Sequence, residues 1–89
     1  MPTIGKVQSK IQKVEGFKAI FLNRDGKSNV RDDLDGIKQY PYQNAAKNDW
    51  NVTDWIQARF KQTYPGFEVR GEDTKGKVVN GNTLLKNIK

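Results

Sequence analysis

The sequence predicts a small α+β domain, in which an antiparallel sheet of three to four strands packs against one central amphipathic helix. First, 89 residues are enough for one domain, residues 1–89, with a single modest core. Second, short segments rich in β-branched and aromatic residues are separated by turn signals, which is typical of two sequential hairpins. Third, one segment between them has clear helical periodicity.

Residues 4–14 fit either a helix or a strand. Apolar residues recur at spacings of three and four, which indicates one stripe of a helix: Ile4, Val7, Ile11 and Val14. However, most of them are β-branched and Gly5 lies early in the segment, which suits a long strand. Both alternatives remain open at this point.

The first hairpin is predicted from residues 17–23, where aromatic and β-branched residues lie on both faces. An Asp-Gly pair adopts the positive φ angles of a tight turn at low cost, so Asp25 and Gly26 should form the turn. Residues 28–34 are then expected to return as a short, polar partner strand. Phe17 and Phe21 are expected to pack in the core.

Residues 35–48 are predicted to form a long surface loop. The segment shows no sustained period, and it contains Gly36 and Pro41, which interrupt regular structure. It is the longest irregular stretch that the sequence predicts.

The central helix follows this loop. Its apolar residues lie at positions i, i+3, i+4 and i+8 of one face: Val52, Trp55, Ile56 and Phe60. Asn51 or Thr53 can cap its first turn, and Asp54 favours the positive end of the helix dipole. Pro65 and Gly66 should end the helix.

The second hairpin is predicted from residues 67–70, which alternate as in a half-buried strand. Lys75 and Gly76 supply a turn, and residues 77–79 can pair back antiparallel. The last apolar residues, from Leu84 onward, suit a short helix or a closing strand, and a short C-terminal helix is slightly favoured.

The residue types argue against an enzyme. The chain has no His and no Cys, so the commonest general base near neutral pH and the strongest side-chain nucleophile are both absent. No phosphate-binding glycine motif occurs either. We therefore expect a protein that is not an enzyme and that needs no cofactor.

Carboxylate chemistry is the remaining catalytic possibility. Asp32, Asp33 and Asp35, together with Glu68, could in principle hold a divalent cation in a phosphodiesterase. The spacing does not match a calcium loop, and exposed charges in a turn explain the cluster more simply. We therefore expect no metal site.

The charge distribution predicts an acidic partner. The formal net charge is +6, and residues 1–31 hold seven Lys or Arg against two acids, while residues 74–89 hold four Lys and none. A basic surface attracts polyanions by releasing their counterions. The sequence therefore predicts a small basic binding module for nucleic acid or an acidic protein, with these candidate contacts: Lys10, Lys13, Lys18, Arg24, Lys27, Lys75 and Lys77.

The alternative function is a protein–protein adaptor or a subunit of a homo-oligomer. It would use an exposed aromatic patch around Tyr40, Tyr42 and Trp50, because aromatic residues are enriched in interfaces. Salt-sensitive binding would favour the basic module, and salt-insensitive self-association would favour the aromatic patch. No apolar stretch is long enough to span a bilayer and no cysteine occurs, so we expect no membrane partner and a cytoplasmic location.

Overall fold

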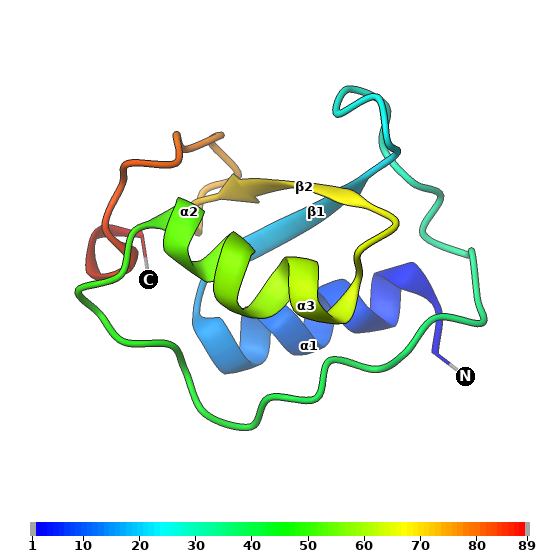
Figure 1. Ribbon diagram of the computed structural model, residues 1–89, viewed down its shortest axis with the longest axis horizontal. Coiled ribbons are helices and arrows are strands. Elements are labelled where there is room, and N and C mark those ends of the chain that lie inside the picture. The colour runs from blue at the N-terminus through cyan, green and yellow to red at the C-terminus, as the bar shows by residue number, and fades with distance from the viewer. Residues whose placement is uncertain (1, 89) are drawn as a thin grey trace.

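The structure, a computed structural model, describes residues 2–88 as a small α+β fold with two antiparallel strands and two helices (Figure 1). The first helix, α1, is followed by a strand, a long loop, a second helix in three consecutive segments, and a second strand. The bounds in chain order are α1 Ile4–Glu15, β1 Lys18–Leu22, α2 Val52–Trp55, η1 Ile56–Phe60, α3 Lys61–Thr63, β2 Glu68–Glu72 and η2 Leu85–Asn87. Figure 1 shows both strands above α1.

Residues 4–14, for which the sequence left helix and strand open, belong to helix α1. Ile4, Val7 and Ile11 are fully buried, so the apolar stripe at spacings of three and four faces the core. The Thr3 side chain accepts a hydrogen bond from the backbone N–H of Lys6 at 3.3 Å, which caps the first turn. Gly16 ends the helix in the left-handed conformation, with φ of 85°.

The sheet has two strands among the described residues, so the prediction of three to four strands is wrong. β1 pairs with β2 in antiparallel register, from Lys18 opposite Glu72 to Leu22 opposite Glu68. The return segment of each predicted hairpin contributes only one isolated bridge: Leu22 with Asn29, and Glu72 with Val78.

The first return segment stops after one bridge because its turn satisfies its own backbone groups. The carboxylate of Asp25 accepts hydrogen bonds from the backbone N–H groups of Lys27 and Ser28, at 2.8 and 3.0 Å. Such local bonds compete with the ladder of a sheet. Residues 27–29 are exposed, so no apolar side chain draws them into a strand.

The predicted central helix is present as the consecutive segments α2, η1 and α3. It is not the single helix that was predicted, because α1 is a second one. Its start is a capping box: the Asn51 side chain accepts from the Asp54 N–H at 2.7 Å, and the Asp54 carboxylate accepts from the Asn51 N–H at 3.2 Å. The middle segment η1 is π-helical, and the helix ends before Pro65. Trp55 and Phe60 are fully buried.

Aromatic rings fill the core between the sheet and the helices. The ring of Phe21 lies edge-on to those of Phe60, Tyr64 and Phe67, with centroids 4.9, 5.0 and 5.5 Å away. Phe17 packs edge-on against the Trp55 ring at 5.1 Å. The expectation that Phe17 and Phe21 are core residues is confirmed.

The C-terminal segment forms a single 3-10 turn, η2, in place of the short helix that was favoured. Leu85, the first residue of this turn, and Ile88, which follows it, are buried in the core. The backbone of Leu85 donates to the carbonyl of Trp50 at 2.8 Å, and Leu84 forms an isolated bridge with Asn51. The turn therefore packs against the start of the second helix.

Candidate binding face

Within residues 2–88, Glu15 at the end of α1 is the only charged residue that is buried. Only 1% of its surface is exposed. Its carboxylate accepts hydrogen bonds from the Tyr40 hydroxyl at 2.5 Å and from the Ala46 N–H at 2.8 Å. It also forms an ion pair with Arg59 at 2.5 Å. Two points of the loop are thus tied directly to α1.

Arg59, on the π-helical segment η1, joins the same loop to the second helix. Its Nη1 donates to the carbonyl of Asn44 at 2.7 Å, and its guanidinium lies 4.4 Å from the centre of the Tyr42 ring. A cation at this distance is attracted to an aromatic face. The loop is therefore held between both helices.

Tyr40 completes this arrangement, which we call the Glu15 cluster: Glu15, Tyr40, Trp55 and Arg59. The Trp55 Nε1 donates to the Tyr40 hydroxyl at 3.1 Å, so the hydroxyl is both donor and acceptor. Burial, together with the hydrogen bond to Glu15, raises the pKa of Tyr40 well above its ordinary value. The phenol therefore stays protonated and keeps donating to the carboxylate.

Residues 37–48 run along α1 on the side away from the strands (Figure 1). The outer side of α1 carries Lys6, Lys10 and Lys13, at spacings of four and three that place them on one stripe. Lys10 reaches the loop, where its Nζ donates to the Gln43 Oε1 at 3.4 Å. The loop adds two further exposed lysines. We define the basic face by these five residues: Lys6, Lys10, Lys13, Lys38 and Lys47.

The basic face has little opposing charge. Residues 4–14 and 37–48 contain no Asp or Glu, and Glu15 is buried and paired. None of the ion pairs found within residues 2–88 includes one of the five lysines. Asp32 lies at the N-terminal end of α1, where its carbonyl accepts from the Gly5 N–H at 2.9 Å, and it bounds the face there. Asp35 and Asp49 lie just outside the loop segment, and no lysine of α1 forms an ion pair within residues 2–88.

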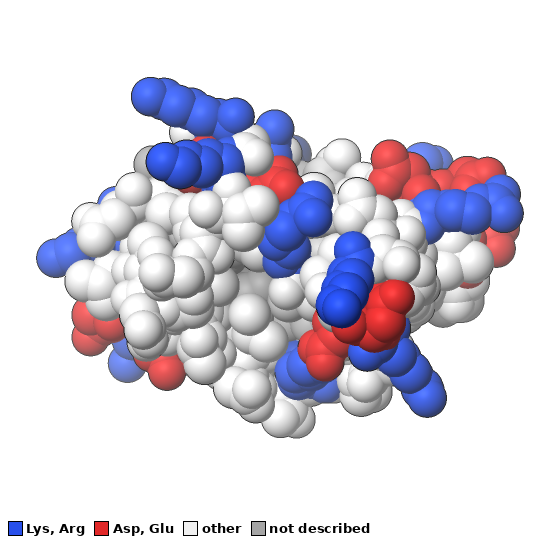
Figure 2. Space-filling view, turned by 90° about the horizontal axis from the view of Figure 1, so that it is seen from above, with Lys and Arg blue, Asp and Glu red and all other residues white. Residues whose placement is uncertain are grey.

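The face over the strands is different. Figure 2 shows blue and red side chains next to one another there, with large neutral areas between them. Arg70 pairs with Glu72 at 3.0 Å, and Lys61 pairs with Glu68 at 2.5 Å. Paired charges of opposite sign produce little field at a distance. The charges of these four residues therefore add little net field on this face.

The seven basic residues that the sequence suggested as contacts for an acidic partner lie in three separate regions of the structure. Lys10 and Lys13 lie on the basic face. Lys18 begins β1 opposite Glu72, close to the turn that carries Lys75 and Lys77. The remaining two, Arg24 and Lys27, follow the other end of β1. The five strand residues of β1 separate these two groups by roughly 15 Å.

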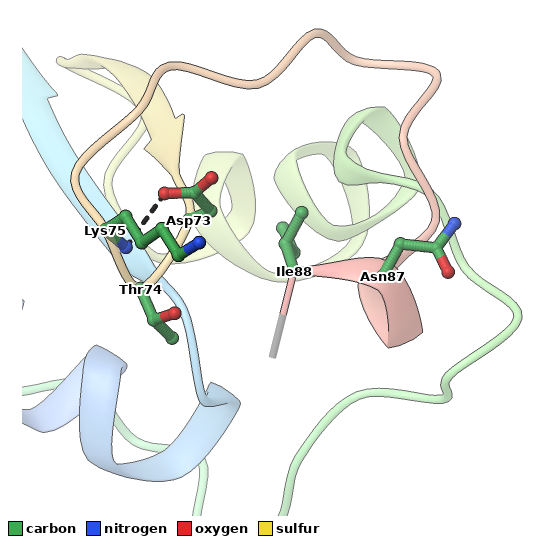
Figure 3. Close-up of a pocket in the computed structure, with 5 residues that line it drawn as sticks. All are labelled: Asp73, Thr74, Lys75, Asn87 and Ile88. Atoms are coloured by element: carbon green, nitrogen blue, oxygen red, sulfur yellow. Dashed lines mark hydrogen bonds between the residues drawn. The ribbon is translucent and has the colours of Figure 1, made fainter.

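Lys75 lies at a small pocket between the 73–77 turn and η2 (Figure 3). The carboxylate there belongs to Asp73, which accepts hydrogen bonds from the backbone N–H groups of Lys77 and Lys75 at 3.0 and 2.9 Å. These bonds hold the pKa of Asp73 below its ordinary value. Its carboxylate is therefore engaged in shaping the turn.

The three candidate interface aromatics do not form one exposed patch. Tyr40 is 1% exposed, which corrects the expectation that it lies on the surface. A tyrosine can be buried when its hydroxyl has partners, and Tyr40 has Glu15 and Trp55. Tyr42 is half-buried under Arg59, and Trp50 is half-buried at a shallow depression beside Asp54.

The acidic residues do not gather into a metal site within residues 2–88: no group of three or more His, Cys, Asp or Glu side chains is placed to hold a metal ion. Asp33 instead forms an exposed ion pair with Arg31 at 2.9 Å. Asp32 contributes its backbone carbonyl to α1, and Glu68 is paired with Lys61.

Sequence reasoning missed Lys6, Lys38 and Lys47 as members of the candidate site. Two signals were available: a helical reading of residues 4–14 places Lys6 on the stripe of Lys10 and Lys13, and residues 37–48 lack acids. The packing of the loop against α1 had no such signal, because it depends on contacts between residues 31 and 44 positions apart.

Comparisons with protein-family models, with curated proteins and with solved structures find no match to this chain. Across residues 2–88, no helix combines the length and the apolar character needed to cross a bilayer. The candidate site therefore stands on the residues of the basic face and of the Glu15 cluster alone.

Proposed function

We propose that this protein is a non-enzymatic binding domain that holds an acidic partner on its basic face. One observation carries the proposal: five lysines lie on α1 and on the adjoining loop, in two segments that contain no acidic residue. A surface with one sign of charge attracts polyanions, and the release of their counterions supplies the affinity.

The Glu15 cluster supports this function because it fixes the loop relative to α1. Ala46 and Tyr40 are bonded to Glu15, and Asn44 is bonded to Arg59. The segment that carries Lys38 and Lys47 is therefore fixed relative to α1 before any partner arrives. Less conformational entropy is lost on binding when the contacting elements are already in place.

The absence of an enzymatic role is part of the same proposal. The chain has neither His nor Cys. Among residues 2–88, the one fully buried carboxylate is that of Glu15, and it already accepts hydrogen bonds from three groups, so it is not free to act as a general base.

Binding to heparin, a generic polyanion, tests the proposal. The test variant carries Lys6→Gln, Lys10→Gln and Lys13→Gln, since Gln is nearly as good a helix former as Lys. The matched control carries Lys27→Gln, Lys75→Gln and Lys77→Gln, all at exposed positions in turns. Each variant lowers the formal charge by three, from +6 to +3.

We expect the α1 variant to leave a heparin column at much lower salt than the control. Equal elution of the two variants would mean that only net charge matters, and it would refute a specific basic face. Failure of the unchanged protein to bind heparin at low salt would refute the function itself. Salt-insensitive self-association in sedimentation would instead favour the aromatic interface.

A further inference from the structure

We infer that the acidic partner is a double-stranded nucleic acid, held through its phosphates without reading of base sequence. This inference rests on the proposed function, because it names the partner of the same basic face. It follows from three properties of that face: the spacing of its lysines, the scarcity of apolar anchors, and the occupied ring of Tyr42.

The lysines of α1 form a rigid row. With a rise of about 1.5 Å per residue, Lys10 and Lys13 lie roughly 6 and 10 Å from Lys6 along the helix axis. Duplex DNA carries one negative charge per about 1.7 Å of its axis, the densest regular array of charge among common partners. A fixed row of cations can therefore meet several phosphates without rearrangement.

The basic face lacks what a protein interface needs. The centre of a stable interface is rich in aromatic residues, Met and Arg and is poor in Lys. Here the two segments that carry the lysines also carry exposed amides, Gln12, Gln39, Gln43 and Asn44. The large hydrophobic side chains exposed among residues 2–88 are Leu34 and Val78, and both lie outside the face. Amides and lysines are typical donors to phosphate oxygens.

A single strand is a poorer fit than a duplex. Proteins hold unpaired bases by stacking them on free aromatic rings. Tyr42 is the half-buried ring of this face, and the guanidinium of Arg59 already covers it at 4.4 Å. The Tyr40 ring packs 5.2 Å from it. Neither of these two rings is free for a base to stack on.

The face also lacks the usual means of reading bases. The commonest specific contact is an Arg that bonds in bidentate fashion to guanine. Arg59, which contacts the loop of this face, is not free for such a contact, because its guanidinium bonds Glu15 and the carbonyl of Asn44. Lysine acts on phosphates as a point charge. Binding should therefore be independent of sequence.

Fluorescence anisotropy with three labelled probes tests the inference: a mixed-sequence DNA duplex, one of its single strands, and poly-L-glutamate. If the five lysines each meet one phosphate, the affinity for the duplex should fall roughly 500-fold between 50 and 200 mM salt. The α1 triple variant keeps two of the five lysines of the basic face, so its affinity for the duplex should fall only roughly tenfold over the same range of salt. The turn variant with Lys27, Lys75 and Lys77 changed to Gln should behave like the unchanged protein.

The outcomes separate the inference from the proposed function. The inference holds if the duplex binds most tightly, and if a second duplex of unrelated sequence binds equally well. Tighter binding of the single strand or of poly-L-glutamate, lost in the α1 variant, would overturn the inference and leave the proposed function standing. Binding of none of the three probes at low salt would overturn both. Circular dichroism of both variants shows whether each remains folded.

Discussion

Glu15 and Arg59, 44 positions apart in the sequence, form an ion pair at 2.5 Å in which the carboxylate side chain is fully buried and the guanidinium is 16% exposed. This pair joins the end of the first helix to the π-helical segment of the second. It also holds the loop whose lysines belong to the basic face.

Arg59→Ala should lower the free energy of unfolding by about 3 kcal/mol, because it leaves the buried Glu15 without its charged partner. Urea denaturation followed by tryptophan fluorescence measures the change. Arg31→Ala is the matched control, since its pair with Asp33 is 84% and 71% exposed. That exposed pair should contribute little to stability. Equal effects of the two substitutions would mean that the buried pair has no special role.

The stability should fall at high pH because of Tyr40 and Tyr64, whose pKa values burial raises above those of the unfolded chain. The folded state keeps protons that the unfolded state releases, so the stabilisation is complete below about pH 10 and is lost as the pH rises further. Each tyrosine should contribute up to about 1.4 kcal/mol per pH unit in this range.

Urea midpoints at pH 8 and pH 11 measure this dependence. Tyr40→Phe should be less stable at pH 8 by about 1–2 kcal/mol, since Glu15 loses a donor, but its stability should decline less between the two pH values. The stability of the double variant, which carries both Tyr40→Phe and Tyr64→Phe, should decline least between the two pH values. An unchanged slope in the double variant would show that other groups cause the loss.

Gln8 closes the free edge of β1. Its side-chain Oε1 accepts from the Phe21 N–H at 2.8 Å, a donor that the two-stranded sheet leaves unpaired. Gln8→Ala should cost about 1–2 kcal/mol and speed hydrogen exchange of the Phe21 amide. Gln12→Ala, on the exposed side of α1, is the control and should change neither quantity measurably. Unaltered exchange at Phe21 in Gln8→Ala would contradict this role.

Gly81 passes close to Thr53. A Cβ atom at Gly81 would lie within 2.2 Å of the Thr53 Oγ1, and the Gly81 carbonyl accepts from the Thr53 N–H at 3.0 Å. Gly81→Ala should therefore destabilise the fold by about 1–2 kcal/mol. Adding Thr53→Ala should recover part of the loss, measured by thermal unfolding. Gly66→Ala is the control, because its nearest neighbour would be the end of the Arg24 side chain at 3.9 Å.

The segments with strong local signals were predicted well. The helix around Trp55 and Phe60 has a regular apolar stripe, a cap and a terminating proline, and these are properties of neighbouring residues. The strand before Asp25 and the strand after Pro65 were found for the same reason. What the sequence did not reveal was that these two strands pair with each other.

The errors arise where distant contacts decide the structure. Short polar segments after a turn can extend a sheet or stop after one bridge, and the choice depends on what they can bury. The alternative function placed Tyr40 in an exposed aromatic patch, but Tyr40 is buried because its hydroxyl bonds Glu15, 25 positions away. The basic face depends on the same contact, so local patterns could identify only part of it.

The pairing of β1 with β2 also bears on how the chain folds. The paired residues, from Leu22 with Glu68 to Lys18 with Glu72, lie 46 to 54 positions apart. The entropy of closing so long a segment is lost before the sheet forms, and proteins dominated by such contacts fold in milliseconds or more slowly. Until β2 arrives, β1 keeps an unpaired apolar edge. If β1 and β2 pair slowly during folding, the aromatic strand β1 can associate with other chains in the meantime. The time that the chain needs to reach the native state, more than the stability of that state, therefore sets the risk of aggregation.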